Sequence, residues 1–203
     1  MHNTKLHIRQ LFIDASGSME FHREALFDTI AEYLGDYRRH VAKYPEAEYR
    51  FGISFFHTSL QPFCRMMTPD SIPELTSEDF RPNGDTALFD GLWQQIDDLE
   101  SSIRDCHGED RVEVDLYIIT DGIDTASTKV RFADLRYRIE SLVVGGHWRF
   151  HFDPADLDTI EVNALIGLRR EMAENSDPGR LRNALVDFLT PGSPNDLPKT
   201  GNP

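Results

Sequence analysis

Five oxygen-bearing side chains stand at three places in the sequence where a strand is expected to end or a helix to begin. Asp14, Ser16 and Ser18 follow the first apolar stretch in a D-x-S-x-S spacing. Thr86 directly precedes the most regular helical pattern, and Asp121 follows another apolar stretch. Two carboxylates and three hydroxyls form an all-oxygen set, which Mg²⁺ and Mn²⁺ prefer in octahedral sites. The sequence therefore offers the ligands of a divalent cation.

The segments that would position these side chains alternate between strand-like and helix-like patterns. Strands are expected at 6–13, 49–58, 61–67, 112–120, 148–152 and 168–173. Helices are expected at 26–41, 88–103, 127–140, 156–165 and 177–189. In the second of these helices, apolar residues recur in steps of three and four from Leu88 to Ile103, the spacing of one buried face. Strands that alternate with helices predict an α/β fold, doubly wound, with helices on both faces of a mostly parallel sheet.

Sheets of this kind bind ligands outside the carboxyl ends of their strands, where loops lead into helices. Asp14 and Asp121 end two of the expected strands, and Thr86 opens a helix. Any one of these residues alone is an ordinary turn or cap residue. Together with Ser16 and Ser18 at the same edge, they predict one converging cation site.

Three segments of the chain resemble the metal ion-dependent adhesion site (MIDAS) of von Willebrand factor A domains. They are D-x-S-x-S after a strand at 14–18, G-x-T-A-L-x-D opening a helix at 84–90, and T-D-G after a buried strand at 120–122. The resemblance implies a six-stranded, mostly parallel sheet of the Rossmann-like kind, with the 61–67 strand antiparallel at one edge.

The resemblance also implies a role for each of the five residues. Ser16 and Ser18 would bind the cation directly through their hydroxyls, and Thr86 would do so in the ligand-engaged state. Asp14 and Asp121 would act through waters or by switching to direct contact. The remaining coordination position would take a carboxylate from a partner protein. Mg²⁺ is the expected ion, with Mn²⁺ and Ca²⁺ as alternatives.

This arrangement would leave the charge of the cation under-compensated, because its direct ligands are neutral hydroxyls. An under-compensated cation attracts an Asp or Glu of a partner even to an acidic protein. The positive end of the helix that begins near Thr86 would add to the attraction. Two departures from the family pattern, Asp85 beside Thr86 and the turn at 152–154, concern the rim of the site.

Composition restricts the classes of partner. The chain has 203 residues with 21 Lys or Arg and 35 Asp or Glu, a formal net charge of -14. Nucleic-acid binding is excluded because phosphate contacts need clustered basic side chains. Anionic membrane surfaces are poor partners for the same reason, and no apolar run reaches the ~20 residues that span a bilayer.

We expect one domain at 1–189 and a disordered tail at 190–203, where prolines and glycines are frequent. Cys64 and Cys106 are far apart and are expected to be free thiols of a reducing compartment. No signal-peptide pattern precedes the first strand, so a cytoplasmic location is expected.

The favoured function is a non-catalytic binding module. Stand-alone bacterial domains of the resembled family often work beside ATPases, kinases or phosphatases, which are therefore the expected partner classes. The alternative is a Mg²⁺-dependent phosphatase of the haloacid dehalogenase type with Asp14 as nucleophile. That chemistry needs a second acid two residues later, and Ser16 stands there. Asp124 is expected to cap a helix rather than to line the site.

Overall fold

The computed structural model describes residues 5–106, 112–121 and 124–154. The elements in chain order are β1 (Leu6–Asp14), η1 (Gly17–His22), α1 (Arg23–Val41), β2 (Glu48–Phe56), β3 (Leu60–Met67), η2 (Pro69–Ser71), α2 (Leu88–Cys106), β4 (Val112–Thr120), α3 (Phe132–Val144) and β5 (Trp148–Pro154). In this part of the chain, no helix has the length and apolar character needed to cross a membrane.

The strands form a five-stranded sheet in the order β3-β2-β1-β4-β5. β1 pairs in parallel with both β2 and β4, and β4 pairs in parallel with β5. β3 pairs antiparallel with β2, which confirms the predicted antiparallel edge strand and the α/β class. The four parallel strands end at one edge of the sheet, called here the carboxyl edge. The predicted segments 156–165, 168–173 and 177–189 and the tail 190–203 lie outside the described residues.

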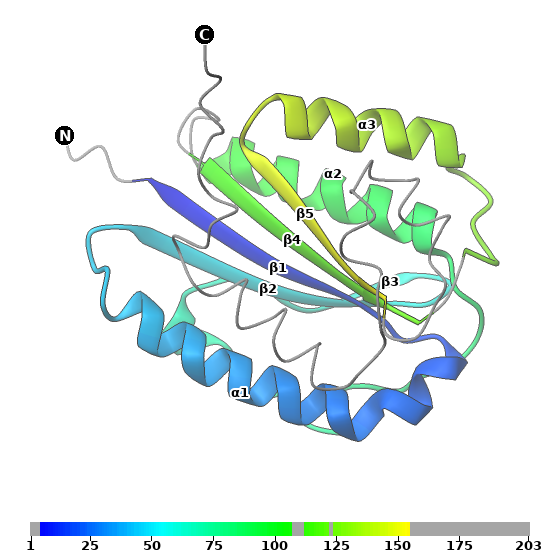
Figure 1. Cartoon of the computed structure of the whole chain (residues 1–203), viewed down its shortest axis with the longest axis horizontal. Coiled ribbons are helices and arrows are strands. Elements are labelled where there is room, and N and C mark those ends of the chain that lie inside the picture. The colour runs from blue at the N-terminus through cyan, green and yellow to red at the C-terminus, as the bar shows by residue number, and fades with distance from the viewer. Residues whose placement is uncertain (1–4, 107–111, 122–123, 155–203) are drawn as a thin grey trace, which may run out of the picture.

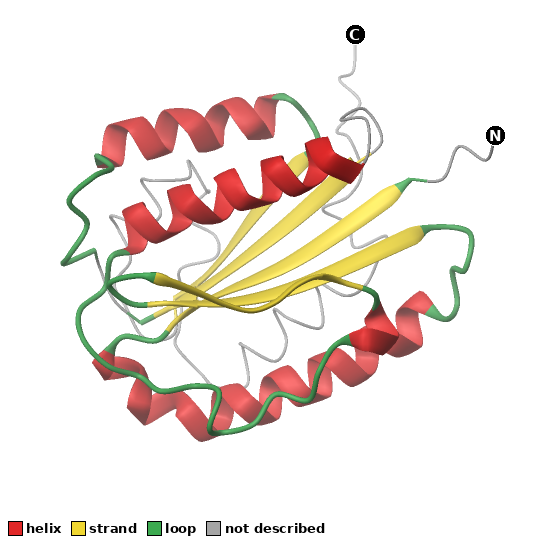
Figure 2. Ribbon diagram, turned by 180° about the vertical axis from the view of Figure 1, so that it is seen from behind, coloured by secondary structure: helices red, strands yellow, loops and turns green. Residues whose placement is uncertain are grey.

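Alternate side chains of the central strand β1 enter two separate hydrophobic clusters. Leu11 and Ile13 belong to the cluster that contains the apolar residues of α1. Leu6, Ile8 and Phe12 belong to the cluster that contains those of α2 and α3. Accordingly, α1 lies along one face of the sheet, while α2 and α3 lie along the other (Figures 1 and 2). Burial on both faces explains why the later parts of β1 and β4, 11–13 and 116–119, are continuous apolar runs.

α2 has the most regular amphipathic pattern of the described helices. Its residues Leu88, Leu92, Ile96, Leu99 and Ile103 are all buried, as their spacing predicts. This stripe packs against the sheet, and the start of α2 lies at the carboxyl edge (Figure 1).

α3 begins later than the sequence pattern predicts, at Phe132 rather than at residue 127. The backbone N–H groups of Thr128, Lys129 and Val130 donate to the Asp90 carboxylate at 2.9, 3.1 and 2.8 Å. Their hydrogen bonds are therefore made to a side chain of α2 and not within a helix. The predicted early start is wrong because a contact from elsewhere in the fold outweighs local helical preference.

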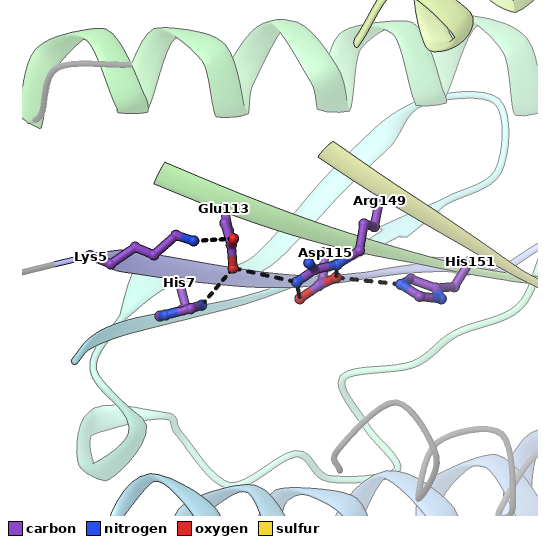
Figure 3. A network of polar contacts seen from close by, with 6 residues as sticks. All are labelled: Lys5, His7, Glu113, Asp115, Arg149 and His151. Carbon is purple, nitrogen blue, oxygen red and sulfur yellow. Dashed lines mark hydrogen bonds and ion pairs between the residues drawn. The ribbon is translucent and has the colours of Figure 1, made fainter. Parts of the chain in front are cut away.

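A polar network lies on the sheet beside the α1 cluster, where β1, β4 and β5 run next to one another (Figure 3). At its centre Asp115 of β4, whose side chain is 7% exposed, accepts two hydrogen bonds from Arg149 at 2.5 and 2.9 Å. His151 Nε2 lies 3.4 Å from the same carboxylate. Burial alone would raise the pKa of Asp115, but the hydrogen bonds from Arg149 and His151 and the nearby charges hold it well below its usual range.

Glu113 occupies the next position on this face and extends the network toward the start of β1 (Figure 3). It contacts Lys5, and His7 Nδ1 lies 3.3 Å from its carboxylate. Arg149 is 3.7 Å away. The hydrogen bond from His7 lowers the pKa of Glu113, and Lys5 and Arg149 lower it further. Partial burial acts in the opposite direction, and the resulting pKa is about 2. The network thus joins three neighbouring strands through polar side chains.

Asp115→Asn should lower the free energy of unfolding at pH 7 by about 2 kcal/mol, because Arg149 then loses the nearer of its two carboxylate partners. A carboxyl whose folded pKa is depressed stabilises the fold above its unfolded pKa, near ~4, and loses that contribution as the pH falls toward the folded value. Urea unfolding at several pH values between ~5 and ~2 should therefore show a shallower decline for the variant than for the wild type. Asp134→Asn, which breaks an exposed pair with Arg131, is the control and should change little. An equal decline in Asp115→Asn and wild type would contradict this account.

Candidate metal site

Two neighbouring strands bring distant acidic residues to the centre of the carboxyl edge. β1 ends at Asp14 and β4 ends at Thr120, and the two strands pair in parallel through Ile13 and Ile119. The Thr120 hydroxyl donates to the Asp14 carboxylate at 2.6 Å, although 106 residues separate them. Asp121 follows directly, so the sheet itself sets the spacing between the two predicted carboxylate ligands.

The D-x-S-x-S loop turns back over the end of β1. The Ser16 backbone N–H donates to Oδ1 of Asp14 at 2.7 Å. The hydroxyls of Ser16 and Ser18 lie 3.2 Å apart, and the Ser18 hydroxyl donates to Asp121 at 2.9 Å. Four of the five predicted residues therefore form one continuous chain of polar contacts, to which two segments of the sequence contribute.

Thr86 lies on the adjacent loop and is buried, with 5% of its surface exposed. The Gly17 N–H donates to the Gly84 carbonyl at 3.1 Å, and the Asn83 N–H donates to the Ala15 carbonyl at 2.9 Å. Gly84 has a φ of +69°, a conformation that glycine adopts without strain. These bonds hold the Thr86 loop against the D-x-S-x-S loop, although the hydrogen bonds described among the other four predicted residues do not include the Thr86 hydroxyl.

The segment that follows Asp121 is tied to Thr86 as well. The Thr86 N–H donates to the Thr125 hydroxyl at 3.1 Å, and the Thr125 and Ala126 N–H groups donate to the Thr86 carbonyl at 2.8 and 3.0 Å. The loop of Thr86 is thus held from two sides, by the D-x-S-x-S loop and by the segment that follows Asp121.

Asp90 and Asp124 complete this connection. A capping role was predicted for Asp124, but for another helix, and no role was predicted for the side chain of Asp90. Asp90 accepts the three backbone N–H groups described above, and the Asp124 carboxylate accepts the Phe89 N–H at 3.2 Å and contacts the Ser127 hydroxyl. Asp124 therefore caps the start of α2 rather than the helix near residue 127 that the sequence indicated. The sequence feature that could have drawn attention to Asp90 is its place in the first turn of α2. The positive end of a helix favours an acidic residue there. We refer to the hydrogen bonds from the Thr128, Lys129 and Val130 N–H groups to the Asp90 carboxylate as the Asp90 clip.

Asp14 is the least accessible member of the set, with no exposed surface. Burial raises the pKa of its carboxyl, the hydrogen bonds from Thr120 and Ser16 lower it, and the charge of Asp121 raises it again; the net direction is upward. An ionised carboxylate at this position is therefore under-stabilised by the protein alone. A cation beside it would supply the missing compensation.

The donor chemistry fits a hard divalent cation. Carboxylate and hydroxyl oxygens are the only side-chain donors of the predicted set. Within residues 5–106, 112–121 and 124–154, no group of three or more His, Cys, Asp or Glu side chains could hold a metal ion. A cation at the carboxyl edge would therefore depend on the Ser and Thr hydroxyls together with the two carboxylates.

No family model matches the sequence, and no curated protein matches it at a significant level. Solved structures match nearly the whole chain. The SpRpn10 VWA domain superposes with a TM-score of 0.61 at 16% identity, over 93% of this chain and 96% of that domain.

Two further matches were solved with a metal. The manganese-loaded TRAP protein of Plasmodium vivax has a TM-score of 0.59 at 11% identity and covers 93% of this chain and 75% of its own. Proximal thread matrix protein 1 from the mussel byssus, solved with a zinc-occupied MIDAS motif, has a TM-score of 0.60 at 13% identity and covers 92% of this chain.

The present chain spans 47% of the mussel protein and 42% of a von Willebrand factor type A protein from Catenulispora acidiphila. Sequence identities of at most 19% with these structures show that the fold is shared. What the site binds has to be argued from the residues of this chain. The sheet order, the antiparallel edge strand and these superpositions agree: the chain has the α/β fold of von Willebrand factor A domains.

Proposed function

We propose that this protein is a non-catalytic interaction module that binds an acidic residue of a partner protein through a divalent cation. The cation, Mg²⁺ in the first instance, would be held by Asp14, Ser16, Ser18, Thr86 and Asp121. The observation that carries the proposal is the chain of contacts from the buried Asp14 carboxylate through Ser16 and Ser18 to Asp121.

The charge of the donor set supports binding over catalysis. The three hydroxyl donors are neutral, and the two carboxylates would act through waters, so a bound cation would keep positive charge that an incoming Asp or Glu can neutralise. The cation supplies a fixed Lewis-acidic point at the carboxyl edge. The protein positions the donor side chains around it, because each donor residue is held by a hydrogen bond or by a backbone contact between neighbouring loops.

Proteins of the same fold support the choice of a divalent cation and of a protein partner. One was solved with manganese and one with zinc in its MIDAS motif. Others include a pilus adhesin and the SpRpn10 domain. We infer that a protein surface is the ligand here as well, and we retain ATPases, kinases and phosphatases as the proposed partner classes.

Metal binding is the first prediction. Calorimetric titration of the EDTA-stripped, dialysed protein with MgCl₂ should give a single binding event that Asp14→Ala and Thr86→Ala each weaken by about tenfold or more. Thr29→Ala, on the exposed side of α1, is the matched control and should bind as the wild type does. Far-UV circular dichroism verifies that each variant is folded. Equal affinities for all four proteins would place the cation elsewhere.

Partner capture and a hydrolysis assay separate the two functional classes. A binding module should capture its partner with Mg²⁺ and release it with EDTA, and should show no turnover of p-nitrophenyl phosphate. Steady Mg²⁺-dependent hydrolysis that Asp14→Asn abolishes would overturn the proposal in favour of a phosphatase.

Asp14→Asn provides a test of the electrostatic account. A carboxyl with a raised folded pKa destabilises the fold once it ionises, so its cost is present at pH 7 and disappears as the pH falls to its unfolded pKa. In EDTA at pH 7, Asp14→Asn should therefore be more stable to urea than the wild type. In saturating Mg²⁺ the order should reverse, because the wild type binds the cation more tightly and gains more stability from it.

Asp28→Asn removes the same charge from an exposed position of α1 and controls for net charge. An Asp14→Asn variant that is less stable than the wild type in EDTA would show that the charge of Asp14 does not strain the metal-free fold.

A further inference from the structure

An aromatic side chain stands exposed beside the candidate metal site. Phe21 belongs to the short helix η1, three residues after Ser18, and 94% of its surface is exposed. Met19 of the same element is fully buried. η1 therefore sends one apolar side chain into the core and leaves its largest one in solvent.

The position of Phe21 distinguishes it from the other large apolar residues that the described structure exposes. Tyr44 follows the end of α1, and Val143 and Val144 end α3. Both helices end at the edge of the sheet opposite to the carboxyl edge (Figure 1). Tyr137 lies within α3. Among the described residues, Phe21 is thus the one strongly exposed large apolar side chain at the carboxyl edge, where a partner would approach the cation.

A single exposed apolar residue is ordinary on a protein surface. What gives Phe21 significance is its continuity with the candidate site: it shares one short segment with two predicted ligands, Ser16 and Ser18. Aromatic side chains that are exposed in the free protein and buried by a partner supply much of the affinity of protein interfaces.

The charges around the site restrict the partner further. Glu20 precedes Phe21 and its side chain is 56% exposed; Arg23, 3.4 Å away, is its partner. Asp85 is exposed next to Thr86. Both carboxylates lie outside the proposed donor set. Asp85, and to a smaller degree the Glu20 carboxylate that Arg23 partly compensates, repels a second negative charge on an incoming segment. A run of acidic residues is therefore disfavoured, while one carboxylate with apolar neighbours is not.

We propose that the partner segment carries one isolated Asp or Glu with a bulky apolar side chain one or two residues away, and that Phe21 packs against that apolar side chain. This inference rests on the proposed function, since the carboxylate is taken to bind the cation. Phe21 then selects among acidic segments, and the cation anchors them.

The test is selection from a random peptide library displayed on phage, with the full chain immobilised in Mg²⁺. Wild-type selections should be enriched in sequences with one acidic residue and an adjacent bulky apolar residue. Phe21→Ala should keep the acidic preference and lose the apolar one. The affinity of a wild-type-selected peptide for Phe21→Ala should fall by about tenfold or more. Tyr137→Ala removes another exposed aromatic side chain, from α3, and should behave as the wild type.

Each other outcome has a defined meaning. Unchanged selection and affinity in Phe21→Ala, enrichment of acidic runs, or no enrichment at all would overturn the role of Phe21. Acidic selection that persists in EDTA would overturn the proposed function, whatever Phe21 does. Two further measurements test other occupants of Phe21. A dimer in sedimentation that depends on Phe21 would assign the side chain to a second copy of the chain, and binding to phosphatidylcholine vesicles that depends on Phe21 would assign it to a lipid surface. Either result would overturn the inference.

Discussion

The carboxylate of Asp14 is fully buried at the end of the central strand, in a place where a charge is costly unless it is compensated. Much of the carboxyl edge is arranged around this constraint. β4 lies beside β1 and supplies the Thr120 hydroxyl, and the following loop turns so that the Ser16 N–H reaches the same carboxylate. These two bonds reduce the free-energy cost of ionising the Asp14 carboxyl without removing it. A cation beside the carboxylate would compensate the remaining cost, which makes the position suitable for a metal site.

The sequence was sufficient to predict the elements whose side chains are patterned locally. The stripe from Leu88 to Ile103 predicted α2, and apolar stretches before Asp14 and Asp121 predicted two strands, which the structure shows to be neighbours. Convergence of Asp14, Ser16, Ser18 and Asp121 followed from general rules of parallel sheets. The placement of Thr86 was predicted to the level of the loop, while the contacts that hold that loop are made by backbone groups and leave no pattern in the sequence.

Features that depend on pairing between distant segments were not predictable in the same way. Asp115 and Arg149 are charged residues within strands, and only the register between β4 and β5 shows that they are partners. The start of α3 was placed too early because helical spacing carries no information about the Asp90 carboxylate on another helix. Phe21 resembles any apolar residue in a helical segment until its exposure is known.

The Asp90 clip has a consequence for how the site comes into being. The bonds that define the carboxyl edge join residues 106, 103 and 38 positions apart, from Asp14 to Thr120, from Ser18 to Asp121 and from Asp90 to Thr128. Contacts of such long range form late, since the intervening chain must first be brought together. Neither half of the chain can hold the five donors, so the site exists only where the central sheet is complete. In a newly synthesised chain, partner capture would thus be delayed until folding is finished.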